Sequence, residues 1–240
     1  MKKNIYILGG CGGIGKELSL IMARSNFNIL IGYYHNKLFA EKFSNEIAND
    51  SIKVQICFVD LADFLSVESF FEYGYKNIGL PDYVVNCAGL ISPRIALKDL
   101  SIEHINDIIN VNLKGVFYLL KEASKLMSLT NGGNGGSIVL LSSEAAKFGG
   151  NLISAYAATK GAINTITIGL ARELALDGIR LNTVSPGVIE NDKNSDDIDI
   201  NAIPLRRKGT TIEVANSIKW LLSEESSYVN GAILQISGGR

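Results

Sequence analysis

The eight residues Leu8-Gly9-Gly10-Cys11-Gly12-Gly13-Ile14-Gly15 decide the fold class of this chain. They end an apolar run of strand length that begins at Ile5, and they precede a segment from Lys16 to Ser25 with apolar residues at helical spacing. Glycine lets the main chain turn tightly and approach a ligand closely, and a helix start offers unpaired N–H groups and a partial positive charge. A strand, a glycine-rich turn and a helix therefore form a candidate pyrophosphate site, although a tight turn without a ligand has the same composition.

The rest of the chain alternates strand-length apolar runs with longer segments of helical period. The runs that predict strands are Ile5–Leu8, Asn28–Tyr33, Lys53–Val59, Tyr83–Asn86, Ser137–Leu141, Arg180–Val184 and Ile233–Ile236. The segments that predict helices, besides Lys16–Ser25, are Lys37–Asn49, Phe64–Lys76, Ser101–Asn110, Leu113–Met127, Tyr156–Leu176 and Ile212–Leu222. Such alternation predicts an α/β, doubly wound Rossmann-type fold: a seven-stranded, mostly parallel sheet with helices on both faces. We expect one domain over residues 1–240, with its ligands at the carboxyl ends of the strands.

Composition excludes several classes of protein. The 240 residues are 47% hydrophobic, and 23 Lys and Arg against 24 Asp and Glu give a net charge of −1, so no nucleic-acid or anionic-membrane surface is expected. The apolar run after Met1-Lys2-Lys3 is too short for a signal peptide, and no run is long enough to span a bilayer. The three cysteines lack metal-ligand spacing, which predicts reduced thiols, no metal site and a cytoplasmic location.

Two polar segments between the predicted elements are interpreted as loops. The run Asn131–Gly136 is a flexible turn between a helix and a strand, and the run Glu190–Asn201, which is acidic and poor in apolar residues, reads as a mobile flap.

The ends of the third and fourth predicted strands carry candidate ligand contacts. After the third strand comes Asp60-Leu61, whose carboxylate suits an adenine amino group but also an ordinary helix cap. After the fourth come Asn86 and the small residues Cys87-Ala88-Gly89, which would let a ribose lie against the main chain but are equally typical of a plain turn.

The fifth predicted strand ends next to Ser142-Ser143, and Tyr156 and Lys160 follow thirteen and seventeen residues after Ser143. Because residues at positions i and i+4 share one face of a helix, the phenol and the ammonium can converge on one pocket. Such a pair also arises by chance on amphipathic helices, where the tyrosine is a core residue with a hydrated hydroxyl. The serines at a strand end favour the functional interpretation.

Taken in order, these pieces resemble the short-chain dehydrogenase/reductase family in its single-domain form, over nearly the whole length. The matching motifs are Gly9-x-x-x-Gly13-Ile14-Gly15, Asp60-Leu61, Asn86-Cys87-Ala88-Gly89, Val111-Asn112-Leu113, Ser143, Tyr156-x-x-x-Lys160, Pro186-Gly187 and Ser237-Gly238-Gly239. Each motif is loose, but the ordered set is specific. The resemblance implies an NAD(P)-dependent oxidoreductase that acts on CH–OH groups.

The resemblance also implies a catalytic group of Asn112, Ser143, Tyr156 and Lys160. A free tyrosine has a pKa of about 10, and an adjacent lysine favours its phenolate. Tyr156 would then exchange a proton with the substrate oxygen, while Ser143 would hold that oxygen. Lys160 would also reach the nicotinamide ribose, and Asn112 would kink a helix and hold a water.

The cofactor-binding residues that the resemblance implies are Gly9, Gly13, Ile14, Gly15, Tyr34, His35, Asn36, Asp60, Leu61, Asn86, Ala88, Gly89, Tyr156, Lys160, Pro186, Gly187 and Ile189. The second predicted strand ends without the acidic residue that NAD-preferring members use for the adenosine ribose. His35, Asn36 and Lys37 could instead bind a 2′-phosphate, or be solvated turn residues. We therefore expect NADP(H), with NAD(H) as the alternative.

Three positions depart from the family pattern. Leu8 stands where Thr or Ser is usual, Gly12 where a phosphate-binding basic residue is usual, and Asn191 where a Thr often holds the nicotinamide carboxamide.

The sequence leaves the substrate open within carbonyl and alcohol compounds. Motifs such as Ile203-Pro204-Leu205-Arg206-Arg207 are similar to the 3-oxoacyl-acyl-carrier-protein reductase branch, but Asp177 and the uncharged Asn131–Gly136 loop replace basic residues expected to hold an acidic carrier. A non-catalytic nucleotide-binding regulator and a purely structural domain are the alternatives of another class. The family implies a homotetramer or a homodimer, for which Ile163, Ile166, Ile168 and Leu170 offer apolar packing unless they are buried against the chain's own sheet.

Overall fold

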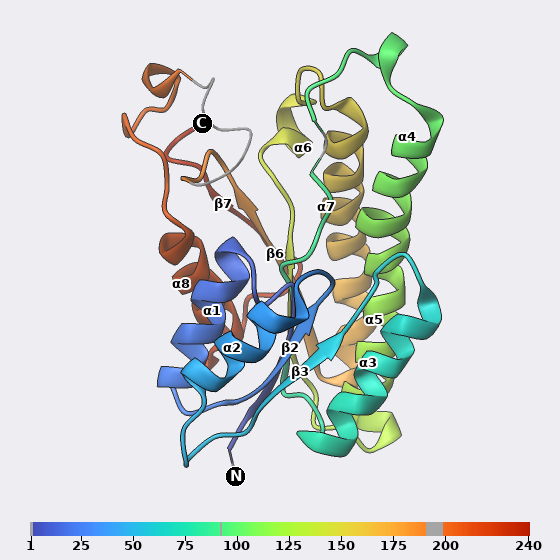
Figure 1. Cartoon of the computed structure of the whole chain (residues 1–240), viewed down its shortest axis with the longest axis vertical. Coiled ribbons are helices and arrows are strands. Elements are labelled where there is room, and N and C mark those ends of the chain that lie inside the picture. Colours follow the sequence, from blue (N-terminus) through green and yellow to red (C-terminus); the bar gives the residue numbers. More distant parts are fainter. Residues whose placement is uncertain (1, 92, 191–198) are drawn as a thin grey trace.

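The chain forms a three-layer α/β/α structure in the computed structural model, which describes residues 2–91, 93–190 and 199–240 (Figure 1). Its seven strands are β1 (Asn4–Leu8), β2 (Asn28–Tyr33), β3 (Val54–Phe58), β4 (Tyr83–Asn86), β5 (Gly136–Leu141), β6 (Ile179–Pro186) and β7 (Ile233–Ile236). They lie in the order β3-β2-β1-β4-β5-β6-β7, and all six pairings are parallel. The predicted doubly wound sheet is confirmed, and in these residues it is wholly rather than mostly parallel.

Helices cover both faces of the sheet. The longer ones are α1 (Gly13–Arg24), α2 (Lys37–Ile47), α3 (Phe64–Asn77), α4 (Ile102–Ile109), α5 (Gly115–Met127), α7 (Ser154–Leu174) and α8 (Thr211–Leu222). Figure 1 shows α1, α2 and α8 on one side of the sheet and α3, α4, α5 and α7 on the other. The sequence did not predict the single turn α6 (Ala145–Phe148).

Alternation along the central strand β1 divides the core into two layers. Ile5 and Ile7 pack toward α1, α2 and α8, whereas Tyr6 and Leu8 pack toward α3, α5 and α7. Because successive side chains of a strand point to opposite faces, one strand of apolar residues supports both layers.

The helix starts are fixed by local capping. Asn36 accepts a hydrogen bond from the Phe39 N–H, Asp63 from Leu65, and Ser101 from His104, and Thr210 forms a reciprocal capping box with Glu213. The cap of α3 is therefore Asp63 and not Asp60, which removes one of the two interpretations of Asp60.

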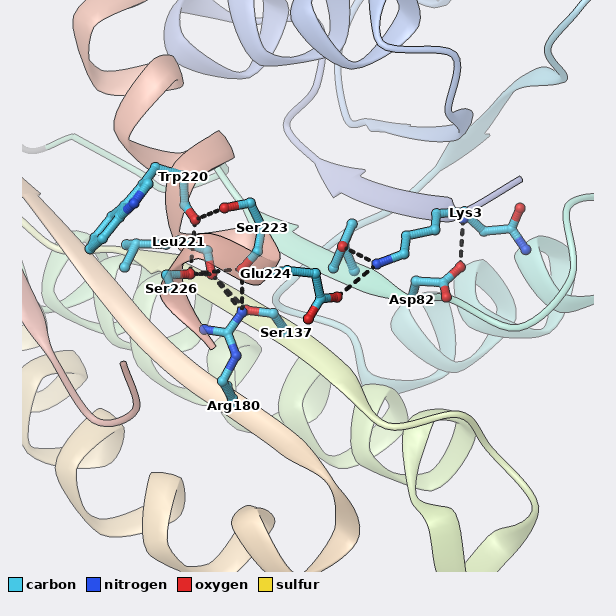
Figure 2. A network of polar contacts seen from close by, with 11 residues as sticks. Lys3, Asp82, Ser137, Arg180, Trp220, Leu221, Ser223, Glu224 and Ser226 are labelled. Carbon is cyan, nitrogen blue, oxygen red and sulfur yellow. Dashed lines mark hydrogen bonds and ion pairs between the residues drawn. The ribbon is translucent and has the colours of Figure 1, made fainter. Parts of the chain in front are cut away.

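The amino edge of the sheet is joined by a polar network. Arg180, near the start of β6, donates to the carbonyls of Leu221 at 3.0 Å and Ser223 at 3.3 Å, which caps the end of α8 (Figure 2). It also donates to the Val229 carbonyl at 3.0 Å. Nearby, the Lys3 ammonium lies 3.1 Å from Glu224 and 2.7 Å from the Tyr83 hydroxyl. Figure 2 shows that Lys3, just before β1, and Arg180 of β6 both bind residues at or just after the end of α8.

Most of the apolar residues suggested for subunit contact pack against the chain's own sheet. Ile163 is buried, and Ile166 and Leu170 pack on the same core, so only Ile168 remains exposed. Among the described residues no helix has the length and apolar character to cross a membrane. Asn191 and most of the Glu190–Asn201 segment lie outside the described residues.

Candidate active site

The glycine-rich turn between β1 and α1 is shaped by close main-chain contacts. Gly9 has a φ of +72°, and a Cβ on it would lie 2.7 Å from the Ala88 nitrogen, while a Cβ on Gly15 would lie 2.3 Å from the Gly9 oxygen. Neither position can hold a side chain without moving the backbone. The turn brings the first N–H groups of α1 to the carboxyl edge of the sheet, where a helix start attracts a phosphate.

One cavity at this edge, here named the strand-2 cavity, has a volume of about 830 Å³. It lies between the glycine turn, the end of β2 and the residues after β3 and β4. Its lining residues are Gly9, Cys11, Gly12, Gly32, Tyr33, Tyr34, His35, Asn36, Phe39, Val59, Asp60, Leu61, Ala62, Cys87, Ala88, Gly89, Leu90, Asp107 and Val111.

The end of β2 contributes no carboxylate to the strand-2 cavity. Tyr34, half exposed, and His35 lie with ring centroids 4.3 Å apart, and the Asn36 side chain accepts from the Phe39 N–H at 3.0 Å. Lys37, which could also bind a 2′-phosphate, does not line this cavity, and its ammonium lies 3.7 Å from Glu41, so its part in binding stays a prediction.

The adjoining tyrosine cavity, of about 540 Å³, brings the remaining motifs together. It shares Gly9 and the residues after β4 with the strand-2 cavity. Its lining residues are Gly9, Gly12, Gly13, Ile14, Cys87, Ala88, Gly89, Leu90, Ile91, Leu141, Ser142, Ser143, Tyr156, Lys160, Pro186, Gly187, Ile189, Glu190 and Thr211. Residues far apart in the sequence therefore meet on one surface.

Lys160 lies one helical turn after Tyr156 on α7, and its ammonium is 5.5 Å from the centre of the Tyr156 ring. The ammonium donates to the Leu141 carbonyl at 2.8 Å. Burial lowers the pKa of Lys160 to about 8, and the nearby Cys87 opposes this shift slightly. The same burial raises the pKa of the Cys87 thiol to about 12, so this cysteine is a poor nucleophile.

Asn112 lies in a π-helical turn (Asn110–Lys114) that separates α4 from α5. Its side-chain oxygen accepts from the Leu90 N–H at 2.7 Å, and its amide donates to the Leu90 carbonyl at 2.9 Å. A Cβ on Gly89 would lie 3.3 Å from the Asn112 oxygen and 3.5 Å from the Lys160 ammonium. Asn112 thus fixes the main chain at Leu90, close to Lys160, although Asn112 itself does not line the tyrosine cavity.

Ser143 lies between the tyrosine cavity and a third one of about 390 Å³, here named the Arg94 cavity. The Ser143 hydroxyl accepts from the Ala145 N–H at 3.2 Å, which fixes the turn before α6. Tyr156 and Gly187 also line both cavities, and Arg94, Glu144 and Arg240 give the Arg94 cavity its charged lining. A substrate group beside Ser143 and Tyr156 can therefore extend into this space.

Of the catalytic and cofactor-binding residues that the resemblance implies, all but three line the strand-2 or the tyrosine cavity. Gly15, Asn86 and Asn112 do not line the cavities: Gly15 packs under the glycine turn, and the Asn86 side chain accepts from the Ala88 N–H at 3.1 Å. Sequence reasoning missed Phe39, Asp107 and Thr211, which reach the cavities from helices and have no motif of their own.

The arrangement defines a class of protein: a Rossmann-type dinucleotide-binding fold in which Ser143, Tyr156 and Lys160 share a cavity with the glycine turn. Comparison with known proteins agrees. A family model described as enoyl-(acyl carrier protein) reductase matches residues 10–240. The chain is 35% identical over 244 residues to the uncharacterized oxidoreductase YgfF of Escherichia coli strain K12, covering 98% of each chain. It is 30% identical over 245 residues to the 3-oxoacyl-[acyl-carrier-protein] reductase FabG of Staphylococcus aureus, covering 100% of this chain and 98% of that one.

Two solved structures are similar over nearly their full length. One is a blue fluorescent protein from a metagenomic library in complex with NADPH, with 27% identity, a TM-score of 0.91 and coverage of 99% and 97%. The other is a short-chain dehydrogenase/reductase of Brucella melitensis, with 29% identity, a TM-score of 0.90 and coverage of 100% and 98%. The chain belongs to the short-chain dehydrogenase/reductase family and is an NAD(P)-dependent oxidoreductase of that family.

Proposed function

We propose that this chain transfers a hydride between NADP(H) and a carbonyl or alcohol substrate, with Tyr156 as the general acid and base. The observation that carries the proposal is the shared lining of the tyrosine cavity, where Ser143, Tyr156 and Lys160 face the glycine turn.

The described residues fit a dinucleotide. The turn around Gly9 leaves no room for a side chain and exposes the start of α1, as a pyrophosphate requires. Asp60 and Leu61 would lie at the adenine and Gly187 at the nicotinamide. The nicotinamide, when bound, supplies or accepts the hydride.

The protein's own groups handle the proton and the developing charge. In reduction the Tyr156 phenol gives its proton to the substrate oxygen, and in oxidation the phenolate takes it back. Lys160 stabilises the phenolate by its charge, and Ser143 donates to the substrate oxygen as negative charge develops there. Asn112 holds the Gly89-Leu90 main chain and so limits where the Lys160 ammonium can lie.

The substitution Tyr156→Phe tests this proposal, because it removes the proton donor and leaves the ring. We expect kcat to fall by at least about a hundredfold, with cofactor affinity within a few-fold of the unmodified protein. The measurement follows nicotinamide absorbance with a carbonyl panel of 2,3-butanedione, 4-nitrobenzaldehyde and the N-acetylcysteamine thioester of acetoacetate. A variant as active as the unmodified protein would exclude Tyr156 as the acid.

The preference for NADP(H) is supported by the end of β2. No carboxylate there opposes a 2′-phosphate, and His35 is the residue of this segment that can carry a positive charge within the cavity lining. The related structure that contains NADPH is consistent with this cofactor.

The substitution His35→Gln tests the cofactor preference, since glutamine keeps a hydrogen-bonding side chain and cannot become cationic. We expect the Kd for NADPH to rise by about three- to tenfold, and the Kd for NADH to stay constant. NADH is the internal control, and fluorescence titration gives both constants. If the unmodified protein binds NADH as tightly as NADPH, the preference is wrong.

A 3-oxoacyl-carrier-protein reductase is the second candidate, favoured by the FabG relatives. Hydrogen bonds from Ser128 and Thr130 hold the pKa of Asp177 below its usual value, so a negative charge remains beside the Asn131–Gly136 loop at neutral pH. This charge opposes an acidic carrier, and comparing a carrier-bound with a small acetoacetyl thioester distinguishes the two functions. Turnover of any compound in the panel excludes a non-catalytic regulator.

We also propose a cytoplasmic homotetramer, with a homodimer as the alternative. Phe117 on α5 and Ile168 on α7 are exposed apolar side chains that suit a subunit contact, and light scattering gives the molecular mass that tests it.

A further inference from the structure

Glu144 directly follows Ser143, and its carboxylate has no part in the proposed reaction. One carboxylate oxygen, Oε1, lies 2.6 Å from the Arg240 Nη1, and both side chains are largely buried, with 14% and 27% exposed. The other oxygen, Oε2, is buried and has no hydrogen-bond partner among the described residues. An ionisable group in such a place is costly to bury, so it calls for an explanation.

The ion pair connects the carboxyl ends of three neighbouring strands. Glu144 continues from β5, and its N–H donates to the Pro186 carbonyl of β6 at 2.9 Å. The Gly187 N–H in turn donates to the Ile236 carbonyl of β7 at 2.9 Å, four residues before Arg240. The Glu144 side chain thus closes a ring of contacts around Gly187.

This ring is tightly packed. A Cβ on Gly187 would lie 2.8 Å from the Ser237 Cα and 3.0 Å from the Glu144 Oε2. Gly187 and Ser143 line both the tyrosine cavity and the Arg94 cavity, and Arg240 lines the latter. A shift of Glu144 would therefore move the Ser143 turn, the Gly187 wall, or both.

We propose that Glu144 and Arg240 are positioning residues, whose ion pair holds the Ser143 turn against Gly187 and so fixes the serine hydroxyl between the substrate and cofactor spaces. The proposal rests on the function proposed above, in which Ser143 donates to the substrate oxygen. Replacing a buried ion pair by apolar side chains is often neutral or stabilising, so stability alone does not account for a charge retained at this turn.

The charge of Glu144 gives the proposal a pH signature. The charged and titratable groups that face it are Arg240 after β7, Lys147 on α6, and Tyr156 on α7 and Arg94 across the Arg94 cavity. Burial raises the pKa of Glu144 above its usual value, and Arg240 and Lys147 oppose this rise. Acidification therefore neutralises Glu144 at a higher pH than an ordinary glutamate, and this breaks its ion pair with Arg240.

The experiment compares Glu144→Gln, Arg240→Met and Arg240→Lys with the unmodified protein, using the carbonyl panel above. Glu122→Gln is the matched control. Glu122 on α5 is also buried, and its carboxylate lies 2.7 Å from the Lys125 ammonium. Neither residue lines the strand-2, tyrosine or Arg94 cavity. We expect Glu144→Gln and Arg240→Met to lose about tenfold or more in kcat, because small misplacements of a catalytic group are costly. Arg240→Lys retains a cation and recovers most of the activity.

Two further measurements separate positioning from loss of fold. In each variant we expect the Kd for NADPH, measured by fluorescence, to stay within about threefold of the Kd of the unmodified protein. The reason is that the adenosine end of the cofactor would bind in the strand-2 cavity, away from Glu144 and Arg240. We expect the pH profile of kcat to have an acidic limb in the unmodified protein, and we expect this limb to disappear in Glu144→Gln and to remain in Glu122→Gln. Circular dichroism confirms that each variant is folded, and if Glu144→Gln does not fold, Arg240→Met and Arg240→Lys carry the test.

Folded Glu144→Gln or Arg240→Met with kcat within twofold of the unmodified protein overturns the positioning role. An equal loss in Glu122→Gln also overturns it, because the effect would then be general. If the unmodified protein turns over none of the panel while Tyr156→Phe binds NADPH equally well, the proposed function itself fails, which is a different result.

Discussion

The Lys160 ammonium is charged in a place that disfavours charge. It is buried beside Cys87, has the Leu141 carbonyl as a hydrogen-bond acceptor, and has no ion-pair partner among the described residues. Its pKa of about 8 compares with 10.5 for an ordinary lysine. Below pH 8 the lysine is protonated in both the folded and the unfolded chain, so the folded state bears a full cost of about 3 kcal/mol. Perturbed groups of this kind are typical of functional sites.

Replacing Lys160 by Met should stabilise the protein while it abolishes turnover. At pH 7 the substitution removes the cost of the buried charge and loses one hydrogen bond worth about 1 kcal/mol, so the free energy of unfolding rises by roughly 1–2 kcal/mol. As the pH rises from 8 to 10.5 the folded lysine loses its proton first, the cost fades, and the gain disappears. Denaturant titrations at pH 7 and pH 10 measure both effects.

The exposed Lys114 provides the control for this prediction. Lys114→Met should change the free energy of unfolding by less than about 0.5 kcal/mol at either pH. If Lys160→Met instead lowers the free energy of unfolding at pH 7 by more than Lys114→Met does, the buried lysine stabilises the folded protein. The prediction that its burial costs stability would then be wrong.

At the scale of elements, the strands were predictable because each forms a distinct apolar run, although only the inner strands are buried on both faces and the edge strands β3 and β7 are partly exposed. Strands β2, β4 and β7 have the predicted bounds, and β6 extends from Ile179 to Pro186, beyond the predicted Arg180–Val184. Helix α1 begins at Gly13, earlier than predicted, because the glycine turn itself enters the helix with Gly12 as a cap that has no side chain. The rule that glycine disfavours helices hides such a start.

Two elements near the site could not be predicted locally. Helix α6 has only four residues, too few for a helical period to show. The π turn at Asn112 is fixed by hydrogen bonds to Leu90, a residue distant in the sequence. Periodicity reports only local structure, so it cannot register such a bond.

The candidate site was likewise predictable only where its residues lie close together in the sequence. Tyr156 and Lys160 lie on one helix, where the spacing of four residues is informative. Other contacts depend on how separate elements pack. Examples are the contribution of Phe39 and Asp107 to the strand-2 cavity and the ion pair between Glu144 and Arg240. Such contacts follow from the tertiary structure and have no sequence pattern.

At the scale of the whole molecule, the two edges of the sheet differ in kind. The amino edge carries the network of Lys3, Arg180 and Glu224 and the capped end of α8 (Figure 2), and these three side chains line a cavity of about 660 Å³ there. The carboxyl edge carries the glycine turn, the strand-2, tyrosine and Arg94 cavities, and a further cavity of about 660 Å³ beside Arg240. The glycine turn and the residues expected to bind the cofactor thus lie at the carboxyl ends of the parallel strands, as the general rule for open α/β sheets expects, and the polar network lies at their amino ends.

This division predicts where the protein responds to NADPH. At a concentration of a hundred times its Kd, a ligand that binds only the folded state adds about 2.7 kcal/mol to the free energy of unfolding, which raises the Tm by roughly 5–10 °C for a chain of this size. Hydrogen exchange should slow in residues 9–15, 32–36, 86–90 and 186–189 and remain unchanged in residues 79–83 and 221–230. A purely structural domain would show neither change, and protection confined to the amino edge would place the cofactor on the wrong side of the sheet.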